Sequence, residues 1–139
     1  MNEIKYSVVS DFKEVQDLFS GLSPYNVIKD CKNLNIKEND YDQIASEIAD
    51  ELANGVGRPT NQDLYIAVNR KASYAKIRIV DIRTNKGKSS GYRCIVLNDK
   101  INHRGYLLHI YKHSAREENI GNKEANKLKQ LVDEYAKEV

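Results

Sequence analysis

The first sixty residues carry apolar side chains at the spacing of amphipathic helices. An alternating segment at 4–9 predicts a half-buried strand, and apolar residues then recur every three or four positions in 12–19, 27–34 and 41–52. Helix-capping residues precede these three segments, namely Asp11, the pair Ser23-Pro24, and Asn39 or Asp40. The pattern therefore predicts one strand followed by three helices.

From Leu64 onward the pattern changes to that of strands. Apolar runs at 64–68, 74–83, 92–97 and 105–113 predict four consecutive strands, separated by polar turns. In the second run the apolar phase slips at Val80, which predicts a β-bulge there. Asn122 is expected to cap a C-terminal helix with its apolar stripe between Ala125 and Tyr135.

This order of elements predicts an α+β fold. An N-terminal strand and helices precede an antiparallel β-meander, and a helix ends the chain. The 139 residues suit a single domain, 1–139, with a mainly helical acidic part at 1–60 and a basic sheet part at 64–139.

The composition is that of an ordinary globular protein, with 40% hydrophobic and 30% charged residues. No apolar run reaches the roughly 18 residues of a membrane span, and the N-terminus lacks a signal-peptide pattern. Cys31 and Cys94 match no metal-binding spacing, so both are expected to be reduced core thiols of a cytoplasmic protein.

The net charge of +2 conceals a strong asymmetry along the chain. Residues 1–63 carry 6 basic and 12 acidic residues, a net of 6 − 12 = −6, and residues 64–139 carry 16 and 8, a net of +8. Between Arg70 and Arg116, 12 basic residues stand against Asp81 and Asp99, a net of +10. Such a block attracts polyanions, although a solvated face without a ligand is the alternative.

The loop between the predicted strands at 74–83 and 92–97 is rich in Lys, Gly and Ser. Lys86 and Lys88 in this loop can reach one phosphate together, and Arg93 at its exit offers bidentate donors. Lys76, Arg78 and Arg83 belong to the same basic stretch.

The last predicted strand carries the candidate proton-transfer groups. Strict alternation predicts that Leu107, His109, Tyr111 and His113 share one face, with Tyr106, Leu108, Ile110 and Lys112 on the other. For His109 the favoured interpretation is a buried residue with a hydrogen-bond partner. His113 ends the strand beside Lys112 and Arg116, where an acid–base role is at least as good a hypothesis as a structural one.

These segments resemble the RelE/HigB group of bacterial toxins, the toxin halves of type II toxin–antitoxin pairs. The similarity covers roughly residues 64–135: KIRI, then GKSSGYRCIVL, a hairpin, YLLHIYKHSAREEN, and the KEANKLKQLV helix. The GYR triplet and the segment after the last strand are its most specific parts. The resemblance implies a microbial-ribonuclease type of fold in which helices cover one side of a small twisted sheet.

The resemblance also implies roles for individual residues. Arg93 corresponds to the arginine that stabilises the phosphate, and Lys86 and Lys88 correspond to the basic residues ahead of it. Lys112 and His113 fall where the group has a basic residue or a histidine, and Tyr111 lies near a stacking or proton-handling position. Arg83 and Arg116, with Lys76, Arg78 and Lys112, are then expected to bind RNA.

The implied activity is metal-independent cleavage of mRNA, usually on the ribosome, by attack of the 2′-hydroxyl on the neighbouring phosphate. No cofactor is expected, and the expected partners are mRNA, the ribosome and a cognate antitoxin, with no membrane. Two alternatives stay open. One is a ParE-like toxin that inhibits DNA gyrase, and the other is an RNA-binding module without catalysis.

Overall fold

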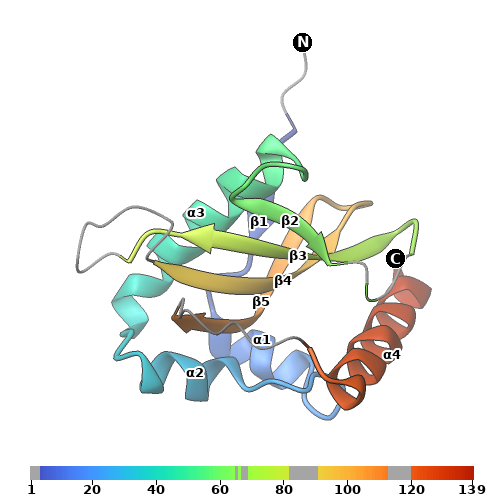
Figure 1. The fold of residues 1–139 in the computed structure, drawn as a ribbon, viewed down its shortest axis with the longest axis horizontal. Coiled ribbons are helices and arrows are strands. Elements are labelled where there is room, and N and C mark those ends of the chain that lie inside the picture. Colours follow the sequence, from blue (N-terminus) through green and yellow to red (C-terminus); the bar gives the residue numbers. More distant parts are fainter. Residues whose placement is uncertain (1–3, 65, 67–68, 82–90, 113–119) are drawn as a thin grey trace.

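The computed structural model describes residues 4–64, 66, 69–81, 91–112 and 120–139. In this part of the chain a five-stranded sheet has the strand order β1-β5-β4-β3-β2 (Figure 1). Its strands are β1 (Ser7–Val8), β2 (Asn61–Leu64), β3 (Ala72–Ile79), β4 (Tyr92–Asp99) and β5 (Arg104–Lys112). Strands β2 to β5 form an antiparallel meander, and β1 lies parallel to β5. The predicted α+β class and meander are confirmed.

The helices of the described residues also follow the predicted order. They are α1 (Phe12–Leu18), α2 (Val27–Asn33), α3 (Tyr41–Asn54) and α4 (Asn122–Glu138), with a 3₁₀ turn η1 (Glu38–Asp40) before α3. Asp11 caps α1 as predicted, because its carboxylate accepts the Glu14 N–H at 3.1 Å.

Two helix starts differ from the prediction. Helix α2 begins at Val27 with Asn26 as its cap, and not at Ser23-Pro24. Ser23 instead accepts the Tyr25 N–H at 3.1 Å in a local turn, which keeps these residues out of the helix. Asn122 is the first residue of α4, and Gly121 occupies the cap position.

The core lies on both faces of the sheet. Residues 75, 77, 94 and 96 face α3, whose Ile44 and Ile48 are fully buried against them. On the opposite face, residues 74, 95 and 97 belong to a second core cluster with Leu128, Leu131 and Val132 of α4. Figure 1 shows α3 and α4 on opposite sides of the sheet. The expectation that helices cover only one side is therefore wrong.

Strand β2 begins at Asn61, three residues before the predicted start. Its polar residues do not show the apolar pattern of a strand, since β2 is the edge of the sheet. Asn61 is nonetheless fully buried, and its amide donates to the carbonyls of Glu51 (2.6 Å) and Gly55 (3.1 Å) at the end of α3. A tertiary contact thus fixes the start of this strand.

The predicted bulge is misplaced. Strands β3 and β4 pair without interruption up to Ile79 and Tyr92, and Val80 lies beyond the strand. The register shift occurs instead in the β4–β5 pairing, where Ile95 is opposite His109 but Val96 is opposite Leu107. Because of this bulge Leu107 shares a core cluster with Ile110, and the predicted strict alternation along β5 fails.

Both cysteines are buried and free, as the sequence predicts. Burial raises the pKa of the Cys31 thiol to about 11, and burial also raises that of Cys94 well above its usual value. Such thiols are poor nucleophiles at neutral pH, so both serve as core residues.

Candidate functional site

The register of the sheet aligns several predicted site residues in two rows on one face. Arg78 of β3, Arg93 of β4 and Tyr111 of β5 lie directly opposite one another. The next row on this face consists of Lys76, Ile95 and His109. Opposite residues on neighbouring strands are about 5 Å apart, so the side chains of each row are close neighbours. We call the charged and aromatic members of these rows, Lys76, Arg78, Arg93, His109 and Tyr111, the basic face.

Accessibility differs among the basic residues of this face. Lys76 and Arg78 are half-buried, whereas Arg93 is only 1% exposed. Along the part of the chain that the structure describes, Arg78 has no ion pair. Arg78 can therefore meet a phosphate directly, but a ligand reaches Arg93 only if the groups around its guanidinium move.

Three aromatic rings, those of Tyr25, His109 and Tyr111, stack on one another at the β5 side of the basic face. Tyr25, from the segment between α1 and α2, lies parallel to His109 with ring centroids 4.3 Å apart and an interplanar angle of 3°. Tyr111 packs on His109 at 5.0 Å and 28°. The Tyr25 hydroxyl donates to Glu124 in the first turn of α4 at 3.0 Å, and burial, together with the Glu124 carboxylate, raises the Tyr25 pKa well above its usual value. The stack thus connects α4 to the sheet.

Asp30 of α2 completes this part of the site. One of its carboxylate oxygens lies 2.7 Å from His109 Nδ1 and accepts the Ile110 N–H at 3.3 Å. His109 thus has the predicted hydrogen-bond partner, but its side chain is 25% exposed, so the prediction that it is buried is wrong. Helix α2 thereby covers the edge of β5 beyond its short pairing with β1.

Lys112 lies on the other face of the sheet. It is opposite Tyr92 in the β4–β5 register, and its ammonium group forms an ion pair with Asp81 and lies 5.4 Å from the centre of the Tyr92 ring. Asp81 is 4% exposed and also accepts the Tyr92 hydroxyl at 3.3 Å. Lys112 and Asp81, the carboxylate within the predicted basic stretch, therefore lie on the opposite side of the sheet from the basic face.

The GYR triplet, residues 91–93, is one of the most specific parts of the resemblance, and its tyrosine and arginine point to opposite faces of the sheet. Tyr92 binds Asp81 on one face, and Arg93 belongs to the other. Gly91 passes so close to the end of β3 that an added Cβ would lie 2.1 Å from the Ile79 carbonyl oxygen. Gly91 and Tyr92 thus have structural roles, and Arg93 is a member of the basic face.

Several predicted site residues fall outside the described residues, so their roles stay predictions. They are Arg83, Lys86, Lys88, His113 and Arg116. Of the remaining ones, the structure brings together Lys76, Arg78, Arg93 and Tyr111.

Sequence reasoning missed Tyr25 and Asp30. Both come from the acidic N-terminal part, in which no chemistry was expected. Asp30 is a polar residue on a short amphipathic helix, and 79 positions separate it from His109. No local pattern connects residues so far apart, so only the tertiary structure shows the pairing.

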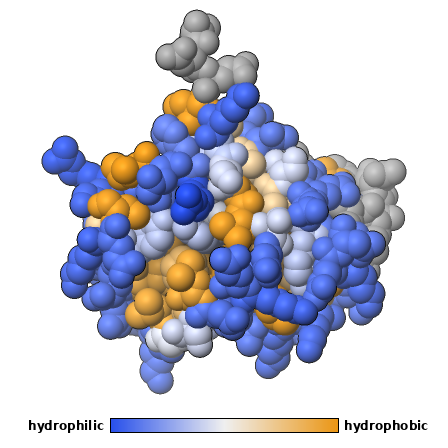
Figure 2. Space-filling model, turned by 180° about the vertical axis from the view of Figure 1, so that it is seen from behind, coloured by the Kyte–Doolittle hydropathy of each residue, from blue (hydrophilic) through white to orange (hydrophobic). Residues whose placement is uncertain are grey.

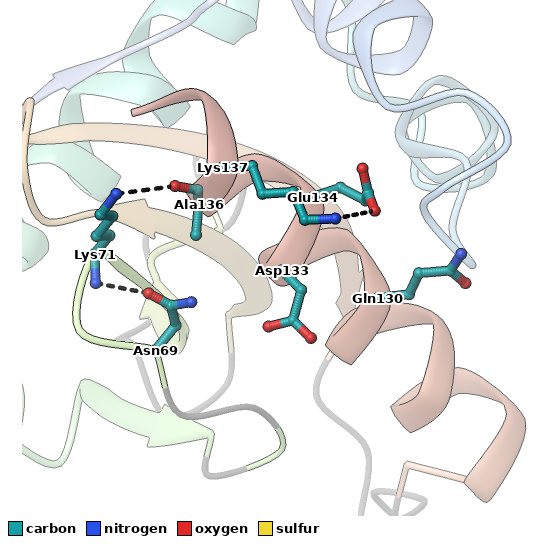
Figure 3. Close-up of a pocket in the computed structure, with 7 residues that line it drawn as sticks. All are labelled: Asn69, Lys71, Gln130, Asp133, Glu134, Ala136 and Lys137. Carbon is teal, nitrogen blue, oxygen red and sulfur yellow. Dashed lines mark hydrogen bonds and ion pairs between the residues drawn. The ribbon is translucent and has the colours of Figure 1, made fainter.

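The described residues contain no group of three or more His, Cys, Asp or Glu side chains that could hold a metal ion. A surface depression of about 580 Å³ lies away from the basic face, between the β2–β3 connection and α4 (Figure 3). There the Lys71 ammonium group donates to the backbone carbonyls of Ala136 (3.4 Å) and Val139 (3.0 Å). The backbone N–H of Lys71 donates to the side-chain oxygen of Asn69 (2.8 Å). These bonds satisfy the C-terminal end of α4, so the depression is a structural junction.

The side of the molecule seen in Figure 2 is mainly hydrophilic, with apolar residues gathered in separate patches. The exposed large apolar side chains of the described residues are Ile4, Leu18, Val56 and Ile101. No helix among the residues described has the length and apolar character needed to cross a membrane.

Comparison with known proteins adds no family to this description. No family model matches the chain, and no curated protein matches it in sequence. The resemblance to RelE/HigB toxins therefore rests on the residues that carry it, and its implications stay proposals.

Proposed function

We propose that this protein is an endoribonuclease toxin that cleaves mRNA and is held in check by an antitoxin. The observation that supports the proposal is the basic face, in which Lys76, Arg78 and Arg93 lie beside the stacked rings of His109 and Tyr111. Cationic side chains bind the RNA backbone, and aromatic rings stack on unpaired bases. The combination suits a single-stranded RNA better than a small molecule.

The chemistry needs a base, a positive charge and a proton source. The 2′-hydroxyl attacks the neighbouring phosphorus, and the bond to the 5′-oxygen breaks, leaving a 2′,3′-cyclic phosphate. Arg78 is the accessible cation of the face, and Arg93 stands next to it in the same row. In the proposal these guanidinium groups stabilise the negative charge that develops on the phosphate oxygens.

One observation favours the alternative of RNA binding without catalysis. Arg93 is 1% exposed, so the residue that the resemblance assigns to the phosphate is not open to a ligand in this structure. A face that binds RNA through Lys76 and Arg78 alone accounts for the charge equally well. The two functions differ in whether RNA is cut.

Controlled expression of Arg93→Ala and Arg78→Ala tests the proposal. The parent protein is expected to arrest growth and to produce mRNA fragments with 2′,3′-cyclic phosphate and 5′-hydroxyl ends. Loss of a group that stabilises transition-state charge costs on the order of 100-fold in rate, so both variants should lose cleavage. Arg58→Ala, at an exposed arginine of the acidic part, is the matched control and should cut normally.

Thermal melting of each purified variant separates lost chemistry from lost folding. If Arg93→Ala is folded and as toxic as the parent while mRNA stays intact, the nuclease function is wrong. Growth arrest with DNA breaks would point to gyrase, and RNA binding with neither cleavage nor arrest would point to the binding module.

A further inference from the structure

We propose that Asp30 and His109 form a proton-transfer pair in which His109 is the general base for the attacking 2′-hydroxyl. The inference deepens the proposed ribonuclease function and rests on it. It assigns catalysis to a histidine inside β5, and the positioning of that histidine to a carboxylate of the acidic N-terminal part.

The contact between the two side chains sets which ring nitrogen can act. Asp30 lies 2.7 Å from His109 Nδ1, and a carboxylate at this distance holds the neutral ring with its proton on Nδ1. Nε2 then carries the free electron pair and can accept a proton. Along the described residues Nε2 has no hydrogen-bond partner, and the side chain is 25% exposed, so substrate can reach it.

The orientation of the imidazole is fixed from several sides. The Tyr25 ring stacks on the imidazole with centroids 4.3 Å apart, and the Tyr111 ring packs on the imidazole at a centroid distance of 5.0 Å. Asp30 itself is held because the same oxygen accepts the backbone N–H of Ile110. A base that is held in place before substrate binds avoids the entropic cost of ordering it during the reaction.

The pair lies beside the groups proposed to bind the phosphate. His109 is opposite Ile95, two positions along β4 from Arg93. Such diagonal neighbours in a sheet are about 7–8 Å apart at the backbone, which long side chains and a bound nucleotide can span. A phosphate beside Arg78 and Arg93 therefore places its ribose near the His109 ring.

The step balances without a further reactant. His109 Nε2 takes the proton of the 2′-hydroxyl while the 2′-oxygen forms its bond to phosphorus. The bond from phosphorus to the 5′-oxygen breaks, and the leaving oxygen takes a proton from water. The resulting imidazolium is stabilised by Asp30 and then returns its proton to water.

A purely structural role for Asp30 is the competing explanation, since this residue also covers the edge of β5. Asp30→Asn distinguishes the two. The amide oxygen can still accept the Ile110 N–H, but the negative charge that stabilises the imidazolium is lost. A structural role predicts a normal rate, whereas the proposed role predicts a lower kcat with an unchanged KM.

The experiment measures cleavage of an oligoribonucleotide, free and on programmed ribosomes, as a function of pH. Asp30→Asn is expected to lower kcat by at least about 100-fold, because the same change at the aspartate that orients the histidine of a Ser-His-Asp triad costs about 10⁴ in kcat. His109→Ala is expected to cleave much more slowly, its residual activity should lack the acidic limb of the kcat/KM profile, and added imidazole should restore part of the rate. His103→Asn, in the β4–β5 turn, is the control and should match the parent.

The pH profile also has to be compared with the other ionisable groups that face His109. These are Asp30 of α2, Tyr25 with Glu124 behind it, Tyr111 of the same strand, and the cations Lys76 and Arg93 of the neighbouring strands. Only a limb that disappears in His109→Ala belongs to His109. Thermal melting of all variants shows whether they fold.

The outcomes separate this inference from the proposed function. If the parent cleaves RNA and folded Asp30→Asn cleaves equally well, the pair is structural and this inference is wrong, while the nuclease function stands. If His109→Ala does not fold, normal kcat in Asp30→Asn still refutes the pair, and a reduced kcat supports it. If the parent cuts no RNA in either assay, the proposed function fails, and the inference fails with it.

Discussion

Single residues at the exit of the predicted phosphate loop show how closely the backbone is packed there. Gly91 runs against the end of β3, where a Cβ would approach the Ile79 carbonyl to 2.1 Å and the Asp81 N–H nitrogen to 2.9 Å. Both contacts are with backbone atoms, which cannot move aside as a flexible side chain can. The glycine of the GYR triplet is therefore needed for packing.

We expect Gly91→Ala to destabilise the protein by about 2–4 kcal/mol, because β3 and β4 must separate to admit the methyl group. Chemical unfolding of purified protein measures this free energy. Gly121→Ala is the matched control, since nothing lies within 4 Å of its added Cβ, and its stability should change by less than about 0.5 kcal/mol. Equal stability of the two variants would contradict the packing argument.

At the level of elements, α4 is anchored to the β4–β5 hairpin by a polar junction. The Tyr135 hydroxyl donates to Asp99 at 2.6 Å, and Asp99 also accepts the N–H groups of Ile101 and Asn102 in the turn, each at 2.9 Å. Burial acts to raise the Asp99 pKa, but these hydrogen bonds outweigh it and hold the pKa below the usual 3.8. The carboxylate thus stabilises both the turn and the helix contact.

This junction predicts how stability depends on pH. Because the Asp99 pKa is lower in the folded chain than in the unfolded one, its contribution is fully present above about pH 4 and is lost as the pH falls through the folded value. Tyr135→Phe should cost about 1–2 kcal/mol at pH 7 and less in acid. Unfolding curves between pH 7 and pH 2 measure this, with exposed Asp133→Asn as the control. A cost that is constant across this range would refute the role of Asp99.

At the level of the whole molecule, part of the basic stretch of the chain gathers on one face of the sheet. The basic residues Lys76, Arg78 and Arg93 converge on one face because they alternate on adjacent strands. Asp30 and Tyr25, both from the acidic N-terminal part, meet the same region through their contacts with His109. The acidic part of the chain thus contributes to the face instead of lying apart from it.

Binding of single-stranded RNA to this face should depend steeply on salt. Each phosphate contact contributes about 0.7 to the slope of log K against log[salt], so Arg78→Gln is expected to reduce the slope by about that amount. Fluorescence anisotropy at several salt concentrations measures it. Arg58→Gln, which removes an exposed arginine from the acidic part, should leave the slope unchanged. An unchanged slope in Arg78→Gln would mean that RNA does not contact the face.

The sequence by itself determined the order of the elements and the α+β class, because apolar periodicity reports which side of each element faces the core. It also indicated Arg78 as part of the basic stretch, and the resemblance indicated Arg93 and Tyr111; their places in the sheet register bring these three side chains into one row. The tertiary structure alone decided what depends on contacts between distant segments. The bulge in the β4–β5 pairing places Leu107 on the other face of the sheet from His109. Lys112 forms an ion pair with Asp81, and α2 places Asp30 beside His109, which is 79 positions away in the sequence. No local spacing encodes such contacts, since they arise only when the elements pack together.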